Sequence, residues 1–469
     1  MEPACLLTHP ATGPYASGQA GQHDRYDAVR TTSTALAAPL SPEDCQVQSM
    51  PDCSPVKWHL AHTTWFFETF LLTQFHPPYT MFHPQYRVLF NSYYNAIGAK
   101  HPRPQRGLLS RPSLADVLHY RQHVDSAMHD LISRLGGNDP DFDALLELGL
   151  NHEQQHQELI LTDVKHMLSA NPLKPAYVVG GSPALPPGTP AGWTRYGGGI
   201  TRIGHDGRGF GFDNEGPAHE VLLAPFHLAD RLVTQHEFLA FIRDGGYKRP
   251  ELWLSAGWDR VCAEGWRAPL YWEGQRDDWR VFTLRGMQEL ELQAPVTHVS
   301  YFEADAYARW ARVRLPREAE WEHAARQLAD PVFPGRANML ENGHLDPRPA
   351  PARNGSGGPV QLFGDAWEWT ASAYDAYPGF KPDAGAVGEY NGKFMCNQYV
   401  LRGGSCATPR DHVRASYRNF FPPEARWQFS GIRLARDASP TVQIFARTPL
   451  AWQKSFVLEF RSSLLSATK

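Results

Sequence analysis

A pair of histidines at helical spacing is the strongest chemical signal in the chain. In the segment NHEQQHQE, residues 151–158, His152 and His156 are four residues apart, and this spacing puts both imidazoles on one face of a helix. Leu145 and Leu148 extend the same stripe, so we expect both imidazoles to face the interior of a helical bundle. Imidazoles in an interior need polar partners, and a metal ion can be one.

A third histidine lies in a second helical pattern, WHLAHTTWFFE. His62 is at the centre of an inward stripe with Trp58 and Trp65, whereas His59 falls off that face. Three neutral imidazoles from two helices would form a site with open coordination positions, which suits Fe(II), Zn(II) or copper. Open positions are typical of catalytic metal sites. The alternative interpretation is that the histidines of 151–158 are an ordinary solvated or hydrogen-bonded pair.

Gln155 directly precedes the second histidine of this pair. From this position it could orient a substrate or a metal-bound imidazole. The alternative interpretation is an ordinary glutamine on the polar flank of the helix.

Helix-start signals surround these residues. Ser54 followed by Pro55 predicts an N-cap and a first turn, and Ser113 predicts the start of another helix. Residues 141–168 and 26–37 supply two further helical segments. The economical interpretation is a four-helix bundle.

The composition and patterning of the chain differ after about residue 175. This part is rich in glycine and proline, with short strand-like runs (EVLLAPFHLA, QYVLRGGS, GIRLAR) and helical pieces at 234–242 and 301–313. A bundle followed by such a region predicts an α+β protein. The predicted divisions are an unstructured segment at 1–22, the bundle at 23–172, a proline-rich linker at 173–195, a second domain at 196–437 and an extension of unknown role at 438–469.

Composition excludes several classes of function. The 469 residues are 42% hydrophobic and carry a net charge of -4, so no global basic field predicts a nucleic-acid or membrane partner. No apolar run reaches the roughly 20 residues of a membrane-spanning helix, and the N-terminus does not resemble a signal peptide. We therefore expect a cytoplasmic protein. The six cysteines show no CxxC spacing, which argues against thiolate zinc or a disulfide framework.

Several longer segments together resemble one enzyme family. They are WHLAHTTWFFE, FNSYYNAIG, HPRPQRGLLSRP, NHEQQHQELILTD, GHDGRGFGFDNE, THVSYFEADAYARWARVRLPREAEWEHAAR and VLRGGSCATPRDHVRASYRNFFPPEARWQFSGIRLAR. Over roughly residues 25–437 the chain is similar to the sulfoxide synthases of ergothioneine biosynthesis. The resemblance implies a DinB-like four-helix bundle joined to a C-type-lectin-like domain of the kind found in formylglycine-generating enzymes.

The resemblance also implies an activity and a cofactor. This family holds non-haem Fe(II) with three histidines, which correspond to His62, His152 and His156. It uses O2 to join a thiol, either cysteine or γ-glutamylcysteine, to C2 of the imidazole of hercynine, and the product is a sulfoxide. Three protein ligands would leave room for the thiol, the imidazole and O2 on the metal.

Further site residues follow from the same resemblance. A phenol can supply a proton and an electron, and the motif NSYY assigns this role to Tyr93 and Tyr94; Tyr374 and Tyr377 are weaker alternatives. Hercynine's trimethylammonium and carboxylate would contact the substrate loop. The residues predicted there are Asn419 and Phe420, with Trp427 or Phe429 nearby.

The identity of the sulfur donor depends on other positions. Arg103 and Arg106 would bind its carboxylate, because guanidinium pairs well with carboxylate. Phe421 stands where relatives that use γ-glutamylcysteine carry an acidic residue, which favours free cysteine. Thr408 and Val413 replace the copper-binding cysteine pair of formylglycine-generating enzymes, which disfavours that activity.

Two alternative functions stay open at this point. One is a selenoneine-type synthase that joins a selenosugar to hercynine with the same iron ligands. The other is a non-catalytic protein, whose lectin-like domain binds a small ligand and whose histidines hold structural zinc.

Overall fold

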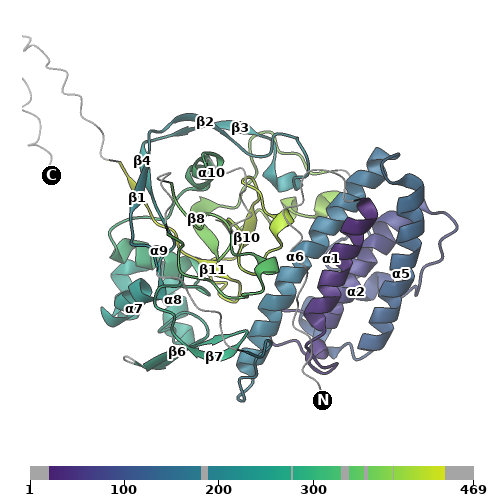
Figure 1. Cartoon of the computed structure of the whole chain (residues 1–469), viewed down its shortest axis with the longest axis horizontal. Coiled ribbons are helices and arrows are strands. Elements are labelled where there is room, and N and C mark those ends of the chain that lie inside the picture. The colour runs from purple at the N-terminus through teal and green to yellow at the C-terminus, as the bar shows by residue number, and fades with distance from the viewer. Residues whose placement is uncertain are drawn as a thin grey trace, which may run out of the picture.

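The computed structural model describes residues 21–180, 188–275, 278–328, 337–352, 358–383 and 385–438. The segments predicted at 1–22 and 438–469 therefore lie almost entirely outside the described residues. Figure 1 shows two halves side by side, a set of long helices and a strand-rich part. We call α1 to α6 the bundle and the residues from β1 to β12 the C-terminal region.

Four long helical segments form the bundle. α2 (Val56–Phe66) continues through a π-helical turn at Phe67–Leu72 into α3 (Thr73–Phe75), and α4 (Tyr86–Leu89) is one turn long. The other long helices are α1 (Gln22–Ala37), α5 (Leu114–Leu135) and α6 (Pro140–Ala170). The predicted helical bundle is confirmed.

Local sequence explains where these helices begin. The hydroxyl of Ser113 accepts from the backbone N–H of Asp116, and the Asp116 carboxylate accepts from the backbone N–H of Ser113. This capping box satisfies two free backbone donors. α6 begins with an Asp139 cap and Pro140. The N-cap predicted at Ser54 is wrong, because Pro55 occupies the cap position of α2 and Ser54 instead donates its backbone N–H to Asp163.

A buried ion cluster joins three helices of the bundle. Glu153 of α6 accepts hydrogen bonds from Arg30 of α1 at 2.8 Å and from Arg121 of α5 at 2.9 Å. All three side chains are buried, and charges in an interior persist only when they are paired. This cluster fixes how α1 and α5 lie against α6.

The C-terminal region combines small sheets with helices packed around them. Its helices are α7 (Gln235–Arg243), α8 (Ser255–Glu264), α9 (Tyr301–Trp310) and α10 (Glu318–Arg326). Its strands are β1 (Trp193–Tyr196), β2 (Gly199–Ile203), β3 (His219–Leu223), β4 (Phe226–Ala229), β5 (Trp272–Gln275), β6 (Asp278–Thr283), β7 (Gly286–Glu289), β8 (Trp367–Ala373), β9 (Tyr399–Arg402), β10 (Asn419–Phe421), β11 (Ser430–Gly431) and β12 (Ala435–Asp437).

The strands of the described residues form four sheets, and the largest of them carries Asn419, Phe420 and Phe421, which were predicted to bind substrate. Its order is β10-β9-β8-β11, beside sheets of order β1-β4-β12, β5-β6-β7 and β2-β3. The predicted α+β architecture is confirmed. The helix predicted at 234–242 is α7, whereas the helix predicted at 301–313 ends three residues earlier, as α9.

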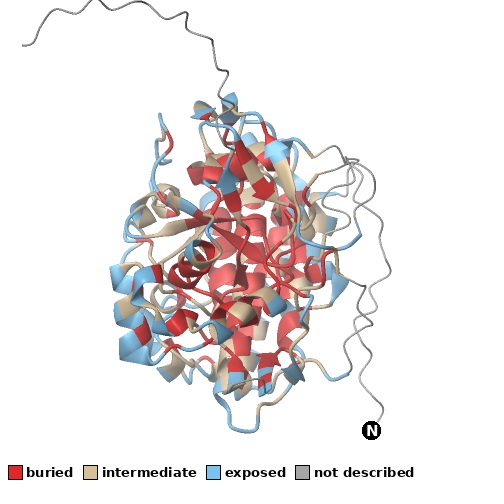
Figure 2. Cartoon of the chain, turned by 90° about the vertical axis from the view of Figure 1, so that its left-hand side faces the viewer, coloured by how far each residue is buried: buried red, intermediate tan, exposed pale blue. Residues whose placement is uncertain are grey.

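One hydrophobic core continues from the bundle into the C-terminal region, since the same cluster contains Trp65 and Leu150 as well as Trp367 and Phe429. Figure 2 shows the buried residues concentrated in the middle of the molecule. A side-chain contact reinforces this junction: the buried carboxylate of Glu158 accepts from Trp367 at 2.8 Å and from Thr408 at 2.7 Å. The interface between the bundle and the C-terminal region therefore combines hydrophobic packing with buried hydrogen bonds.

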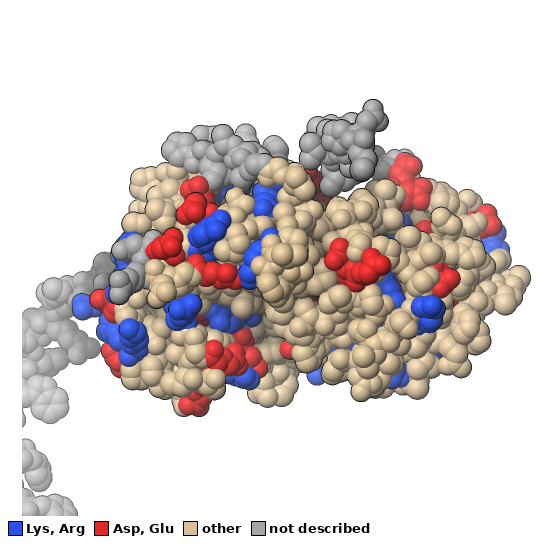
Figure 3. Space-filling model, turned by 90° about the horizontal axis from the view of Figure 1, so that it is seen from below, with Lys and Arg blue, Asp and Glu red and all other residues tan. Residues whose placement is uncertain are grey.

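Surface charges are mixed on the face that Figure 3 shows, where described acidic and basic side chains are interspersed, most densely over the strand-rich half. Within the described part of the chain, none of the helices combines the length and the apolar character that crossing a bilayer requires.

Candidate metal centre

Three buried histidines converge where α2 passes α6. His62 comes from α2, and His152 and His156 come from α6. One ring nitrogen of each lies within 4.8 Å of the others, and their ring centroids are 4.7 to 5.0 Å apart. The structure thus brings together the three residues that the sequence analysis selected as metal ligands.

A glycine lets these two helices approach closely. A Cβ at Gly149, one turn before His152, would lie 2.7 Å from the ring of Phe67 and 3.1 Å from that of Phe66, closer than a side chain tolerates. On α2, the rings of Trp58 and Trp65 stack on the His62 imidazole at 4.6 and 5.5 Å. The imidazole is therefore held by packing on both sides.

Hydrogen bonding leaves ring nitrogens free for a metal. His62 Nδ1 lies 2.6 Å from the Phe90 carbonyl, which can only accept, so this nitrogen carries the proton and Nε2 presents a lone pair. Within the described residues, His62 Nε2 and both ring nitrogens of His152 have no hydrogen-bond partner. Buried polar atoms without partners are rare in folded proteins, so a metal ion fits this cluster.

The three imidazoles are neutral. Burial, followed by the neighbouring imidazoles, lowers the pKa of His62 and His156 well below the usual range. Burial also lowers the pKa of His152, to about 3. Neutral imidazole is the form that binds metals, and three such donors suit Fe(II), Zn(II) or copper better than Mg²⁺ or Ca²⁺.

The interpretation of His59 is corrected. It was expected to lie off the inward face, yet its Nδ1 lies 2.8 Å from His156 Nδ1 and its Nε2 lies 3.0 Å from the Asp163 carboxylate. All three residues are buried. The stripe on α2 alone could not reveal this contact, because Asp163 and His156 belong to another helix.

Gln155 links the cluster to the C-terminal region. Its amide nitrogen donates to the Tyr417 hydroxyl at 2.9 Å, and its carbonyl oxygen accepts from the Tyr390 hydroxyl. The Tyr390 ring also contacts the His152 ring, at 5.6 Å. Sequence reasoning missed Tyr390, which belongs to no pattern with recognisable spacing. Tyr417 begins the segment YRNFF, residues 417–421, which was expected to offer aromatic and polar groups to hercynine, but its contact with Gln155 was not predicted.

Each of the two predicted donor tyrosines is separated from a cluster histidine by one intervening aromatic ring. Tyr94 contacts Trp65 at 5.6 Å, and Trp65 stacks on His62. Tyr93 contacts Tyr390 at 6.2 Å and stacks on Tyr94 at 4.6 Å. Burial raises the pKa of both phenols, so both are protonated at neutral pH. Within the described residues, neither of the alternatives, Tyr374 and Tyr377, contacts a cluster histidine.

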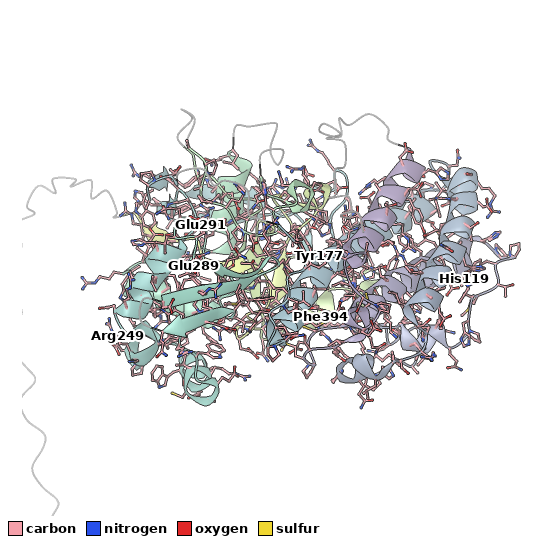
Figure 4. The ribbon with its side chains drawn as sticks, turned by 60° about the horizontal axis from the view of Figure 1, so that its bottom comes forward. His119, Tyr177, Arg249, Glu289, Glu291 and Phe394 are labelled. Carbon is pink, nitrogen blue, oxygen red and sulfur yellow. The ribbon has the colours of Figure 1, made fainter. Side chains whose placement is uncertain are left out.

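The predicted hercynine residues are on and beside β10. Phe420 stacks on Tyr374 at 4.0 Å and approaches Phe394 at 6.0 Å, and Phe394 contacts Tyr93 at 5.2 Å. Figure 4 shows Phe394 where the bundle meets the C-terminal region. Phe420 is thus connected to Tyr93 through a single ring.

The other predicted substrate residues are less directly connected to the cluster. Asn419 accepts from the backbone N–H of Phe420 at 2.9 Å. Phe421 and Trp427 pack edge to face at 5.6 Å. No contact joins these three side chains to the histidines within the described residues.

The two predicted arginines are not equivalent. Arg106 is buried, lies 3.3 Å above the Trp58 ring and donates to the hydroxyls of Ser54 and Ser92. Arg103 is exposed and donates to the backbone carbonyl of Asp52. The structure therefore places Arg106 beside the cluster and leaves Arg103 at the surface.

A cavity of about 670 Å³ lies between the bundle and the C-terminal region. Leu148 of α6, one turn before His152, lines one side, and Phe212 and Tyr390 line the other. Asp213 and Asp383 add carboxylates to its wall. The cavity is adjacent to the histidine cluster and is wide enough for a small organic molecule.

Comparison with known proteins covers both halves of the chain. Residues 25–160 match the DinB superfamily, and residues 189–438 match the sulfatase-modifying factor enzyme 1-like domain. A hercynine oxygenase of Mycolicibacterium thermoresistibile is 35% identical over 413 residues, which cover 82% of this chain and 88% of the relative. The hercynine oxygenase of Mycobacterium tuberculosis is 34% identical over 82% of this chain and 92% of its own length.

A second group of relatives matches a smaller part of the chain. A formylglycine-generating enzyme of Streptomyces coelicolor is 31% identical over 317 residues, covering 57% of this chain and 96% of its own length. Similarity to the two oxygenases thus extends over more of the chain than similarity to this enzyme.

Proposed function

The chain belongs to the hercynine oxygenase family of oxidoreductases, and on this premise we propose that it joins a thiol to the imidazole C2 of hercynine with O2. One thiol, one imidazole C–H and one O2 give one sulfoxide and one water. The observation that carries the proposal is the buried cluster of three neutral imidazoles at the junction of the bundle and the C-terminal region. The thiol we propose first is free cysteine, with γ-glutamylcysteine as the alternative.

The proposed cofactor is Fe(II), held by His62, His152 and His156. When bound, the iron would activate O2 and bring the sulfur and the imidazole together. The protein's own contribution is to present three unprotonated ring nitrogens in a buried setting. That setting excludes bulk water, which would compete for the open positions.

Hercynine is proposed to enter through the cavity beside the cluster. Its trimethylammonium group cannot donate hydrogen bonds, so aromatic faces and carboxylates are its natural partners. Phe212, Tyr390 and Asp213 line the cavity, and Gln155 with Tyr417 would hold the polar end of the substrate near the histidines. Asn419, Phe420 and Trp427 complete the proposed contacts on the side of β10.

Proton delivery is proposed for Tyr93 and Tyr94. Both phenols keep their protons at neutral pH because burial raises their pKa. A protonated phenol can give a proton, or a proton together with an electron, to a reacting centre. Tyr94 contacts Trp65 and Tyr93 contacts Tyr390, and these two rings lie between the stacked tyrosines and the histidine cluster.

The sulfur donor's carboxylate is proposed to bind Arg106. Burial lowers the pKa of this guanidinium, yet it stays protonated at neutral pH because the intrinsic pKa of arginine is so high. Arg103 would assist from the surface side. Phe421 offers no charge for a γ-glutamyl ammonium group, which favours free cysteine.

A division of the chain is part of the same proposal. The bundle at 23–172 would provide the metal ligands and the proton donors, and the region at 196–437 would provide the substrate loop, joined by the segment 173–195.

The test is an anaerobic loading of the full-length protein with Fe(II), followed by O2 and hercynine. Cysteine, γ-glutamylcysteine and a selenosugar are offered in parallel, and the products are identified by mass spectrometry. Hercynylcysteine sulfoxide is the expected product. A selenium adduct as the main product would assign the protein to selenoneine synthesis, and absence of O2 consumption with every donor would favour a binding protein. Metal-free protein is the matched control.

A further inference from the structure

A second histidine and a carboxylate lie directly behind one of the proposed metal ligands. His59 of α2 fills the space between His156 and Asp163, with its two ring nitrogens 2.8 Å from one and 3.0 Å from the other. His59 is 2% exposed and Asp163 is 6% exposed. Solvent therefore does not satisfy these groups, and the hydrogen bonds among them must be internally consistent.

The chemistry of the groups assigns the protons along this chain. A carboxylate only accepts hydrogen bonds, so His59 Nε2 donates to Asp163. In a neutral imidazole the other nitrogen then carries a lone pair, so His59 Nδ1 accepts from His156 Nδ1. This leaves His156 with its proton on Nδ1 and its lone pair on Nε2.

Asp163 is itself held in place by the backbone. The same oxygen that accepts from His59 also accepts from the Ser54 N–H at 2.8 Å. Ser54 precedes α2, so the carboxylate is fixed relative to the helix that carries His59 and His62. The His59 ring is therefore held on one side by the fixed Asp163 carboxylate and on the other by His156.

The three proposed ligands differ in how they are held. The Phe90 carbonyl fixes the tautomer of His62, and no described group is hydrogen-bonded to either nitrogen of His152. Within the described residues, His156 is the only one of the three with side chains hydrogen-bonded in series behind it. The sequence positions of this relay, His59 and Asp163, were not among the residues selected for the metal site.

We propose that Asp163 and His59 form a positioning relay that fixes His156 as an Nε2 metal ligand. The inference rests on the proposed metal centre, and it concerns how the site is organised. Outer-sphere partners of metal-bound histidine orient the ring and raise its basicity, and their loss typically costs about 10–100-fold in metal affinity. Here the carboxylate acts through an intervening imidazole, so the relay joins three side chains from two helices.

The test uses Co(II) as the only added metal and full-length apoprotein under anaerobic conditions. The dissociation constant is measured by competition with a chelator, and the ligand-field absorption reports the coordination of the bound ion. His59→Leu removes the acceptor that faces His156, whereas His59→Asn retains a side-chain oxygen close to the position of Nδ1. Asp163→Ala removes the carboxylate and frees the His59 ring.

The relay predicts about 10–100-fold weaker Co(II) binding and a changed absorption spectrum for His59→Leu and Asp163→Ala. His59→Asn should recover most of the affinity and the wild-type spectrum, which a merely structural role for the ring would not explain. Glu68→Gln is the matched control, because Glu68 is equally buried on the same helical segment and, among the described residues, bonds only Tyr79, Tyr120 and the backbone of Phe82. It should lower stability and leave the spectrum unchanged.

Two different outcomes would contradict the relay and the metal centre, so the two hypotheses are tested separately. Wild-type affinity and an unchanged spectrum in both His59→Leu and Asp163→Ala would overturn the relay. Failure of the wild-type protein to bind Co(II) would instead remove the metal centre on which the proposed function depends. If Asp163→Ala does not fold, the comparison of His59→Leu with His59→Asn decides the question alone.

Discussion

The amide of Gln155 donates a 2.9 Å hydrogen bond to the hydroxyl of Tyr417, which joins the residue before one proposed metal ligand to the C-terminal region. The same hydroxyl is 3.0 Å from His412 Nε2. A side chain of α6, the helix that carries two of the proposed metal ligands, is therefore oriented by a residue of the C-terminal region. Substrate binding and the interface between the two halves should respond to the same substitutions.

Tyr417→Phe tests this coupling. Removing the hydroxyl deprives the half-buried amide nitrogen of Gln155 and the buried Nε2 of His412 of this partner. An unpaired buried polar group costs about 1–3 kcal/mol. We expect the KM for hercynine to rise about tenfold and the KM for the thiol to change little, as measured by steady-state O2 consumption. Tyr177→Phe is the control, since Tyr177 bonds the Leu36 carbonyl at 2.7 Å away from the cluster; Figure 4 shows it at the junction of the halves. Equal effects on both substrates would contradict the coupling.

Loss of any one of the three histidines should abolish stable metal binding. His62→Ala, His152→Ala and His156→Ala each remove a ligand, so affinity should fall by more than the roughly 10–100-fold that an outer-sphere partner contributes. Iron content after anaerobic loading and desalting measures the effect. His119→Ala should retain wild-type iron, because His119 is exposed on α5, as Figure 4 shows. Full iron retention in any cluster variant would remove that residue from the ligand set.

The hydroxyls of Tyr93 and Tyr94 should determine whether the sulfur is joined to hercynine as a sulfoxide or is only oxidised. Tyr94→Phe keeps the ring packing against Trp65 and removes only the hydroxyl, so we expect O2 consumption to persist while the product shifts from the sulfoxide to the oxidised thiol. The ratio of sulfoxide to sulfinic acid, measured by mass spectrometry, reports this shift. Tyr93→Phe and Tyr390→Phe are measured alongside. An unchanged ratio in both Tyr93→Phe and Tyr94→Phe would assign the proton donor elsewhere.

The buried carboxylate of Glu153 should make stability depend on acidity. Burial raises its pKa, but Arg30 and Arg121 outweigh this effect and bring the pKa down to about 2. The unfolded chain binds this proton near pH 4.5, so the contribution to stability is complete above that pH and is lost as the pH falls toward 2.

Glu153→Gln removes this contribution. We expect the free energy of unfolding to drop by about 3–5 kcal/mol at neutral pH, because, among the described residues, the buried guanidinium of Arg121 loses its carboxylate partner and that of Arg30 is left with Asp125 alone to offset its charge. The difference from wild type should narrow as the pH falls below 4.5. Urea denaturation across a pH series measures both effects. Glu289→Gln is the exposed control and should change stability by less than about 0.5 kcal/mol; a difference that stays constant with pH would contradict the assignment.

The sequence alone determined the features that depend on short-range periodicity. Two histidines four residues apart must share a helical face, so the pair His152 and His156 was recognisable without coordinates. The stripe around His62 predicted a third inward imidazole in the same way, and the capping residue Ser113 predicted the start of α5. The expected α+β architecture followed from the change in patterning along the chain.

Tertiary structure alone decided which residues from different elements touch. The contact of His59 with His156 and Asp163 depends on the close approach of α2 and α6 at Gly149. Tyr390 reaches Gln155 from an irregular segment more than 200 residues away. No periodic pattern encodes such contacts, because they arise from how packed helices and loops fit together after each has formed locally.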